Sequence, residues 1–160
     1  MSRAFVKEDG PDNTPLPDLP ISPHPNYVTE TGLAQLQDRL AIRQSDLASL
    51  RSRIDRLDRL PEAAAERDIR YLDARLRSAI LVADTPAPQS VGFGVRVTLR
   101  DDAGQVQTWR IVGEDQADSS AGLIAPQAPL AQSLMGAMPG DQVDWVKPRG
   151  TVTLTVLSLA

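Results

Sequence analysis

The sequence predicts an α+β protein in which an N-terminal antiparallel helical hairpin is followed by an antiparallel sheet with one short helix. The hairpin is indicated by leucines that repeat at heptad spacing from Leu33 to Leu57, a pattern typical of coiled coils. The sheet is indicated by a change of hydrophobic period to two beyond residue 92. A chain of 160 residues is long enough for one or two small domains with a real core.

The first 27 residues have a different composition from the rest of the chain. They carry prolines at positions 11, 15, 17, 20, 23 and 25 and few apolar side chains. This composition predicts a disordered or extended leader over residues 1–27. Two roles stay open for it, a flexible tail or a peptide that docks on a partner.

The first predicted helix begins at "TETG", where Thr29 is a candidate N-cap. The inward heptad positions that follow are 33, 36, 40, 43, 47, 50, 54 and 57. All of them are apolar except Arg43. Pro61 is expected to end this helix, because proline lacks an amide donor. The helix would then have about 32 residues and a length of roughly 48 Å.

Pro61 also suits the first turn of a second helix. Apolar residues recur there at three-four spacing, at positions 65, 69, 72, 76 and 79. Because the connection is short, the two helices must fold back on each other. We therefore expect an antiparallel coiled-coil hairpin over residues 28–83 and a proline-bearing linker over residues 84–92.

Residues 93–160 alternate in hydrophobicity and are broken by turn residues. The expected strands are "FGVRVTLR", "QVQTWRIVG", "GLIA", "QVDWV" and "TVTLTVLSL". The segment "PLAQSLMGA" begins with proline and has helical spacing, so it is the expected short helix.

Composition excludes several classes of function. The net charge is −4, with ten Arg against nine acidic residues over 29–82, so direct nucleic-acid binding is not expected. The chain has no cysteine and a single histidine, His24, which excludes disulfides, thiolate zinc sites and histidine pairs. It also lacks a long apolar run and a signal-peptide pattern. A cytoplasmic protein without a membrane span is therefore predicted.

Two groups of carboxylates are candidate sites. In "GEDQAD", Glu114, Asp115 and Asp118 could bind a cation or a basic partner, or the aspartates could simply satisfy the amides of their own loop. At the hairpin tip, Asp58 and Glu62 are either solvated side chains or ligands that complete the shell of a Mg²⁺ held mainly by another protein.

Several strings resemble the Gre family of bacterial transcription elongation factors. They are "YVTETGLAQLQDRL", "FGVRVTLRDDAGQVQTWRIVGEDQAD" and "GLIAPQAPLAQSLMGAMPGDQVDW". Within them, "FG", "IVGED", "AD", "PLA" and "GD-V" stand in the family's order and spacing. The resemblance covers about residues 27–160.

The resemblance implies an FKBP-like C-terminal domain and a partner, RNA polymerase. It implies docking of that domain at the rim of the polymerase's secondary channel, around Asp115, Asp118 and the segment Gln127, Ala128, Pro129 and Leu130. Tip acids, here Asp58 and Glu62, would help to hold a shared Mg²⁺ while the polymerase cleaves backtracked RNA. The factor itself would be a monomeric accessory protein and not an enzyme.

The sequence departs from the family pattern in two places. The tip reads "DRLPEAAAE" instead of an Asp-Leu-x-Glu-Asn type motif, in a hairpin shorter by roughly 11 Å of reach. A shortened hairpin also resembles the Rnk branch, which implies a polymerase-binding regulator without cleavage activity. The docking segment reads "APQAP" where the family has a Ser-x-Asp/Asn-Ser-Pro type motif.

Two alternatives belong to other classes of protein. An FKBP-like prolyl isomerase would need an aromatic-lined cleft, and the region beyond residue 90 offers only Phe93, Trp109 and Trp145. A coiled-coil dimer is the other alternative, although the second helix is expected to cover the leucines of the first.

Overall fold

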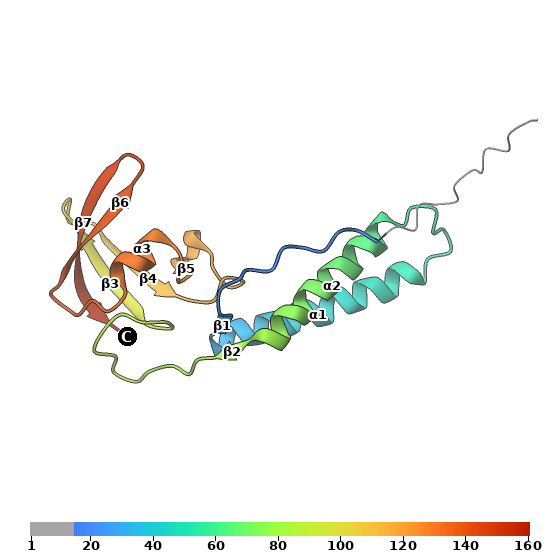
Figure 1. Cartoon of the computed structure of the whole chain (residues 1–160), viewed down its shortest axis with the longest axis horizontal. Helices are drawn as coiled ribbons and strands as arrows, with labels where there is room; N and C mark the ends of the chain where they lie inside the picture. Colours follow the sequence, from blue (N-terminus) through green and yellow to red (C-terminus); the bar gives the residue numbers. More distant parts are fainter. Residues whose placement is uncertain (1–14) are drawn as a thin grey trace, which may run out of the picture. The chain divides into compact units, whose positions relative to one another are not determined.

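The computed structural model describes residues 15–160, which group into two units (Figure 1). Within the described chain, one unit holds residues 15–23 and 37–77, and the other holds residues 24–36 and 78–160. The first unit contains most of the helical hairpin, and the second contains the sheet. The segment 24–36 groups with the sheet although the sequence predicted that the hairpin begins at residue 28. The part of the predicted leader before residue 15 lies outside the described residues.

Helix α1 spans Glu30–Arg51 and begins at the predicted cap. The Thr29 hydroxyl accepts a hydrogen bond from the Gly32 amide at 3.0 Å, and the Thr29 carbonyl accepts one from Leu33 at 2.9 Å. These bonds satisfy amides that a helix start otherwise leaves without partners. The prediction of Thr29 as an N-cap is confirmed.

The prediction of a first helix of about 32 residues is wrong, because α1 has 22 residues and ends at Arg51. The leucine pattern runs on beyond the helix, but Ile54 and Leu57 are 106% and 84% exposed. Aspartates interrupt this stretch, and their side chains bond to nearby backbone amides in competition with a helix. Pro61 therefore does not end the first helix.

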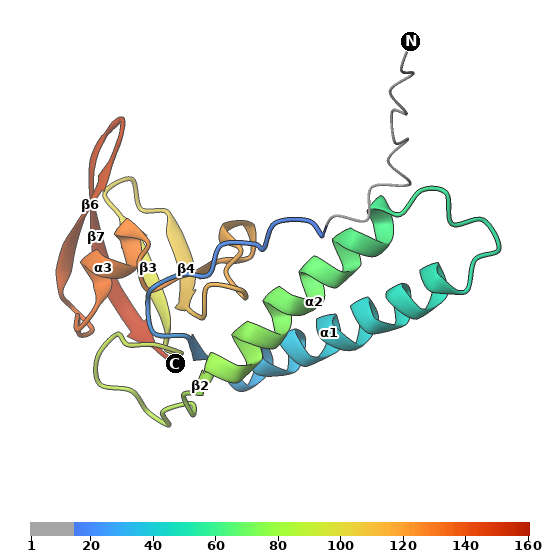
Figure 2. The same ribbon diagram turned by 45° about the vertical axis from the view of Figure 1, so that its right-hand side comes forward.

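Helix α2 spans Leu60–Ser78, with Pro61 as its second residue, as predicted for a proline in the first turn. It runs antiparallel to α1 (Figure 2). In the hairpin unit, Leu47 of α1 and both Ala65 and Leu72 of α2 are buried. An ion pair between Arg51 and Glu66, at 2.7 Å, links the two helices on the surface.

A parallel ribbon of two short strands, β1 (Tyr27–Val28) and β2 (Ile80–Leu81), joins the chain before α1 to the chain after α2. Gly113 lies against this ribbon, and a Cβ at that position would stand 2.5 Å from the Tyr27 carbonyl oxygen. The Thr29 hydroxyl also donates to Oε1 of Gln116 at 2.7 Å. These contacts explain why residues 24–36 belong to the same unit as the sheet.

The sheet has five strands in the order β5-β4-β3-β7-β6. Their bounds are β3 Arg96–Asp101, β4 Val106–Ile111, β5 Leu123–Ile124, β6 Gln142–Lys147 and β7 Gly150–Leu159. The α+β class is confirmed. The sheet is mixed, however, because β5 pairs with β4 in parallel and the other pairs are antiparallel. A tight hairpin turn cannot join β4 to β5, and the segment between them is an eleven-residue loop.

The core of this unit lies between the sheet and helix α3 (Pro129–Leu134). Alternate residues of β3, Val97 and Leu99, are 0% and 1% exposed, as the period of two predicted. From α3, Leu130 and Leu134 pack into the same cluster. Helix α3 and the strands of the sheet thus pack around one apolar core.

Among residues 15–160, no helix is both long enough and apolar enough to cross a membrane.

Candidate functional site

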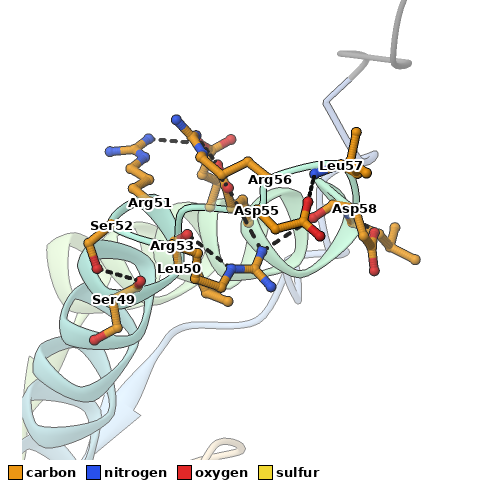
Figure 3. A network of polar contacts seen from close by, with 12 residues as sticks. Ser49, Leu50, Arg51, Ser52, Arg53, Asp55, Arg56, Leu57 and Asp58 are labelled. Atoms are coloured by element: carbon orange, nitrogen blue, oxygen red, sulfur yellow. Dashed lines mark hydrogen bonds and ion pairs between the residues drawn. The ribbon is translucent and has the colours of Figure 1, made fainter.

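The hairpin tip is the eight-residue loop 52–59 between α1 and α2 (Figure 3). Two aspartates in it accept hydrogen bonds from amides two residues further on. Asp55 accepts from Leu57, and Asp58 accepts from Leu60, each at 3.0 Å. Such Asx turns hold a loop in shape without strands or a helix.

Arg53 ties the two ends of this loop together. Its Nε donates to the Leu50 carbonyl at 3.1 Å, and its Nη2 donates to the Asp58 carbonyl at 3.2 Å (Figure 3). The first bond satisfies a carbonyl at the end of α1, where no intrahelical partner exists. The arginines of the tip therefore shape the loop in addition to charging its surface.

Glu62, in the first turn of α2, is held by arginine. Its two carboxylate oxygens accept hydrogen bonds from Nε and Nη2 of Arg56, at 3.0 and 2.5 Å. Arg53 adds a more distant ion pair at 3.9 Å, and the Glu62 side chain is only 6% exposed. The hydrogen bond from Arg56 lowers the pKa of Glu62, and the same bond raises the pKa of Arg56. Glu62 is thus a charged member of a bidentate pair and faces away from solvent.

The two tip carboxylates predicted from the sequence therefore differ in their surroundings. Asp58 is exposed on the loop, and its Oδ1 supports the start of α2. Glu62 is buried in an ion pair. The sequence placed both residues at the tip, but the spacing of four residues did not reveal that Arg56 folds back onto Glu62. Within the described residues, no group of three or more acidic or histidine side chains could hold a metal ion alone.

The loop that carries Asp115 and Asp118 leads into a short 3₁₀ turn, η1 (Ser119–Ala121). Asp118 is the N-cap of this turn, and its Oδ1 accepts from the Ser120 amide at 3.0 Å and from the Ser120 hydroxyl at 2.6 Å. These bonds lower the pKa of Asp118. Of the two readings left open by the sequence, self-capping of the loop describes Asp118.

The segment 127–130 divides between surface and core. Gln127 and Pro129 are exposed, Ala128 is half-buried, and Leu130 is 3% exposed inside the core cluster. Pro129 opens α3, and the Ala128 amide closes a turn onto the Ala125 carbonyl at 3.0 Å. Leu130 therefore positions this segment and has no surface to offer a partner.

An apolar cavity of about 310 Å³ adjoins this segment, and the sequence did not predict it. Trp109 and Trp145 line it with their ring centroids 6.4 Å apart in an edge-to-face arrangement. Lys147 places its Nζ 3.8 Å from the centroid of the Trp145 ring. The cavity depends on the approach of Trp109 of β4 to Trp145 of β6, two strands that are not adjacent in the sheet.

The family model for the C-terminal region of the transcription elongation factors GreA and GreB matches residues 86–160. GreA of Desulfovibrio desulfuricans is 36% identical over 101 residues, 62% of each chain. GreA of Psychrobacter cryohalolentis is 31% identical over 152 residues, which cover 88% of this chain and 96% of that protein.

The chain belongs to the Gre family of transcription elongation factors. Among solved structures, GreA factor homolog 1 (Gfh1) of Thermus thermophilus is similar at 20% identity and a TM-score of 0.41, over 86% of this chain and 99% of that one. Membership of the Gre family confirms the family predicted from the sequence strings.

Proposed function

We propose that this Gre-family protein binds bacterial RNA polymerase at the rim of its secondary channel and acts on paused, backtracked complexes through the hairpin tip. The observation that carries the proposal is the alignment with a GreA protein over 96% of that relative, which includes both the hairpin and the sheet. A sequence alignment confined to the sheet would support docking alone. An alignment that includes the hairpin also supports an action at the hairpin tip.

At the tip, we assign the role of metal helper to Asp58 and not to Glu62. An exposed carboxylate is a suitable ligand for a hard cation such as Mg²⁺, which the polymerase would hold with its own residues. Glu62 would first have to leave two hydrogen bonds from Arg56. Removing a partner from such a pair leaves a buried charge without compensation, which opposes that rearrangement.

For docking, we propose the surface formed by Gln127, Pro129 and the adjoining tryptophan cavity. This surface combines a polar side chain, an exposed proline and an apolar hollow lined by Trp109 and Trp145. Aromatic pockets of this kind are typical anchors of protein interfaces. Leu130 and Asp118 contribute indirectly, since the first packs the core beneath and the second caps its own loop.

The protein would act as an accessory factor, because the polymerase supplies the catalytic site and most of the metal shell. The carboxylate of Asp58 would add one oxygen ligand and negative charge next to the Mg²⁺. We therefore expect the purified protein to leave free RNA intact and to act only on a polymerase complex.

The experiment is RNA cleavage in a stalled, backtracked elongation complex of the cognate polymerase. The wild-type protein is compared with Asp58→Asn, Glu62→Gln and a control, Asp102→Asn, in an exposed turn of the sheet domain. We expect cleavage by the wild type and the control, a loss of at least about tenfold with Asp58→Asn, and a smaller loss with Glu62→Gln.

Polymerase binding is measured for every variant in parallel. Absence of binding by the wild type would contradict the proposal that RNA polymerase is the partner. Binding without cleavage would overturn the role of Asp58 and leave a factor that regulates by occupying the channel. Equal losses for Asp58→Asn and Glu62→Gln would show that the ion pair opens on the polymerase.

A further inference from the structure

Residues 15–23, "PLPDLPISP", lie along helix α2 in the hairpin unit (Figures 1 and 2). Arg70 of α2 holds this segment at two points. Its Nε donates to Oδ1 of Asp18 at 2.6 Å, and its Nη2 donates to the Leu16 carbonyl at 3.0 Å. One guanidinium group thus binds both the side chain and the backbone of a segment more than fifty residues away.

The same segment lines a groove formed by both helices. Leu19, which is half-buried, shares a cavity of about 310 Å³ with residues of α1 and α2. The helical residues are Arg39, Ile42, Arg43, Asp68, Tyr71 and Leu72. Ile21, two residues further on, does not line this groove and is 46% exposed. Of these two apolar residues of the segment, Leu19 lines the groove and Ile21 does not.

The groove lies where the leucine repeat of the hairpin is interrupted. Arg43 occupies an inward heptad position, and neighbouring Ile42 remains 58% exposed. Of residues 37–51 of α1, Leu47 is the one that is buried. On α1, little apolar surface is buried at the level of Arg43, although Leu72 of α2 is 2% exposed there. Helices of this length need tertiary packing to be stable in water.

The sequence of the segment suits it to cover such a groove. Prolines at 15, 17, 20 and 23 restrict the backbone to an extended form and reduce the entropy lost when it is ordered. They also remove amide donors that would otherwise need partners. Leu19 and Asp18 supply an apolar group and a carboxylate, which match the apolar side chains of the groove and Arg70.

We propose that residues 15–23 are a brace that docks on the hairpin at the level of Arg43 and stabilises it there. The brace is also releasable, because Asp18 and Arg70 are 74% and 41% exposed and such ion pairs weaken as salt screens them. This inference concerns the hairpin itself and does not depend on the proposed partner.

The test is hydrogen exchange by mass spectrometry on the full-length protein, read in peptides that contain residues 39–43 and 68–72. The variants are Asp18→Ala and Leu19→Ser, with Ile21→Ser as the matched control from the same segment. We expect exchange about three- to tenfold faster in both peptides for the first two variants and no change for the control. The effect of Asp18→Ala should shrink as sodium chloride is raised, because salt weakens the same ion pair.

Exchange in the sheet, read over residues 96–101, serves as the internal reference and should be the same in all variants. Unchanged exchange in the hairpin for both Asp18→Ala and Leu19→Ser would overturn the brace. Equal acceleration by Ile21→Ser would also overturn it, because the contact would then lack the specificity that the groove implies.

Discussion

At the scale of single residues, the pair of Glu62 and Arg56 determines the state of the hairpin tip. The bidentate hydrogen bonds join the loop to the first turn of α2, and the low exposure of Glu62 protects them from water. A glutamate in the first turn also interacts favourably with the positive end of the helix dipole. Both effects favour the charged form of the side chain.

The lowered pKa of Glu62 makes the order of the tip dependent on pH. Stabilisation of the folded tip is fully present above the ordinary glutamate pKa, about 4.3, and is lost as the pH falls through the lowered value. We expect the NMR signals of the Arg56 guanidinium group, which bonds to Glu62, to shift in this acidic range. Glu62→Gln should abolish that titration, and its persistence in the variant would assign it to another carboxylate.

At the scale of the elements, α1 ends before its leucine pattern does. Heptad spacing continues to Leu57, but the helix stops at Arg51 and Arg53 bonds the Leu50 carbonyl. Apolar side chains at Ile54 and Leu57 are consequently presented at the tip and not within the hairpin. Periodicity alone could not show whether Ile54 and Leu57 lie inside a longer helix or in the loop, because the sequence spacing is the same in both cases.

A pair of substitutions tests whether Ile54 lies in the exposed loop or inside a longer hairpin. Leu47→Ala should destabilise the hairpin by about 2–3 kcal/mol, because a buried side chain is lost. Ile54→Ala should change stability by no more than about 0.5 kcal/mol, since Ile54 is fully exposed. Urea unfolding monitored by circular dichroism provides the comparison. Similar losses for both variants would place Ile54 inside a longer hairpin.

At the scale of the whole molecule, part of the apolar face of each helix is covered within one chain. Leu47, Ala65 and Leu72 are buried between α1 and α2, and Leu19 of the brace covers part of the adjoining groove. A coiled-coil dimer would have to expose these side chains before a second chain could replace the first. We therefore expect the internal hairpin to disfavour self-association through the helices.

We expect sedimentation equilibrium to give the monomer mass of about 17.3 kDa at micromolar concentration. The substitution Leu72→Ser weakens the packing between the helices, whether they pair within one chain or between two chains. A stable wild-type dimer that Leu72→Ser dissociates would show that the helices pair between chains.

Local features were predictable from the sequence because they depend on residues only a few positions apart. Heptad spacing predicted a hairpin, Thr29 predicted the start of α1, and alternation predicted buried Val97 and Leu99. Pro61 and Pro129 each predicted a helix start. The short motifs that resemble the Gre family predicted the family, since their order along the chain carries information that composition lacks.

Tertiary structure alone decided which of the predicted site residues are accessible. The burial of Leu130, the pairing of Glu62 with Arg56 and the cavity beside Trp145 depend on how backbone segments approach in space. The brace is the clearest case, because the bond between Asp18 and Arg70 joins residues 52 positions apart. No local pattern encodes such a contact, since its energy arises only after the helices have packed.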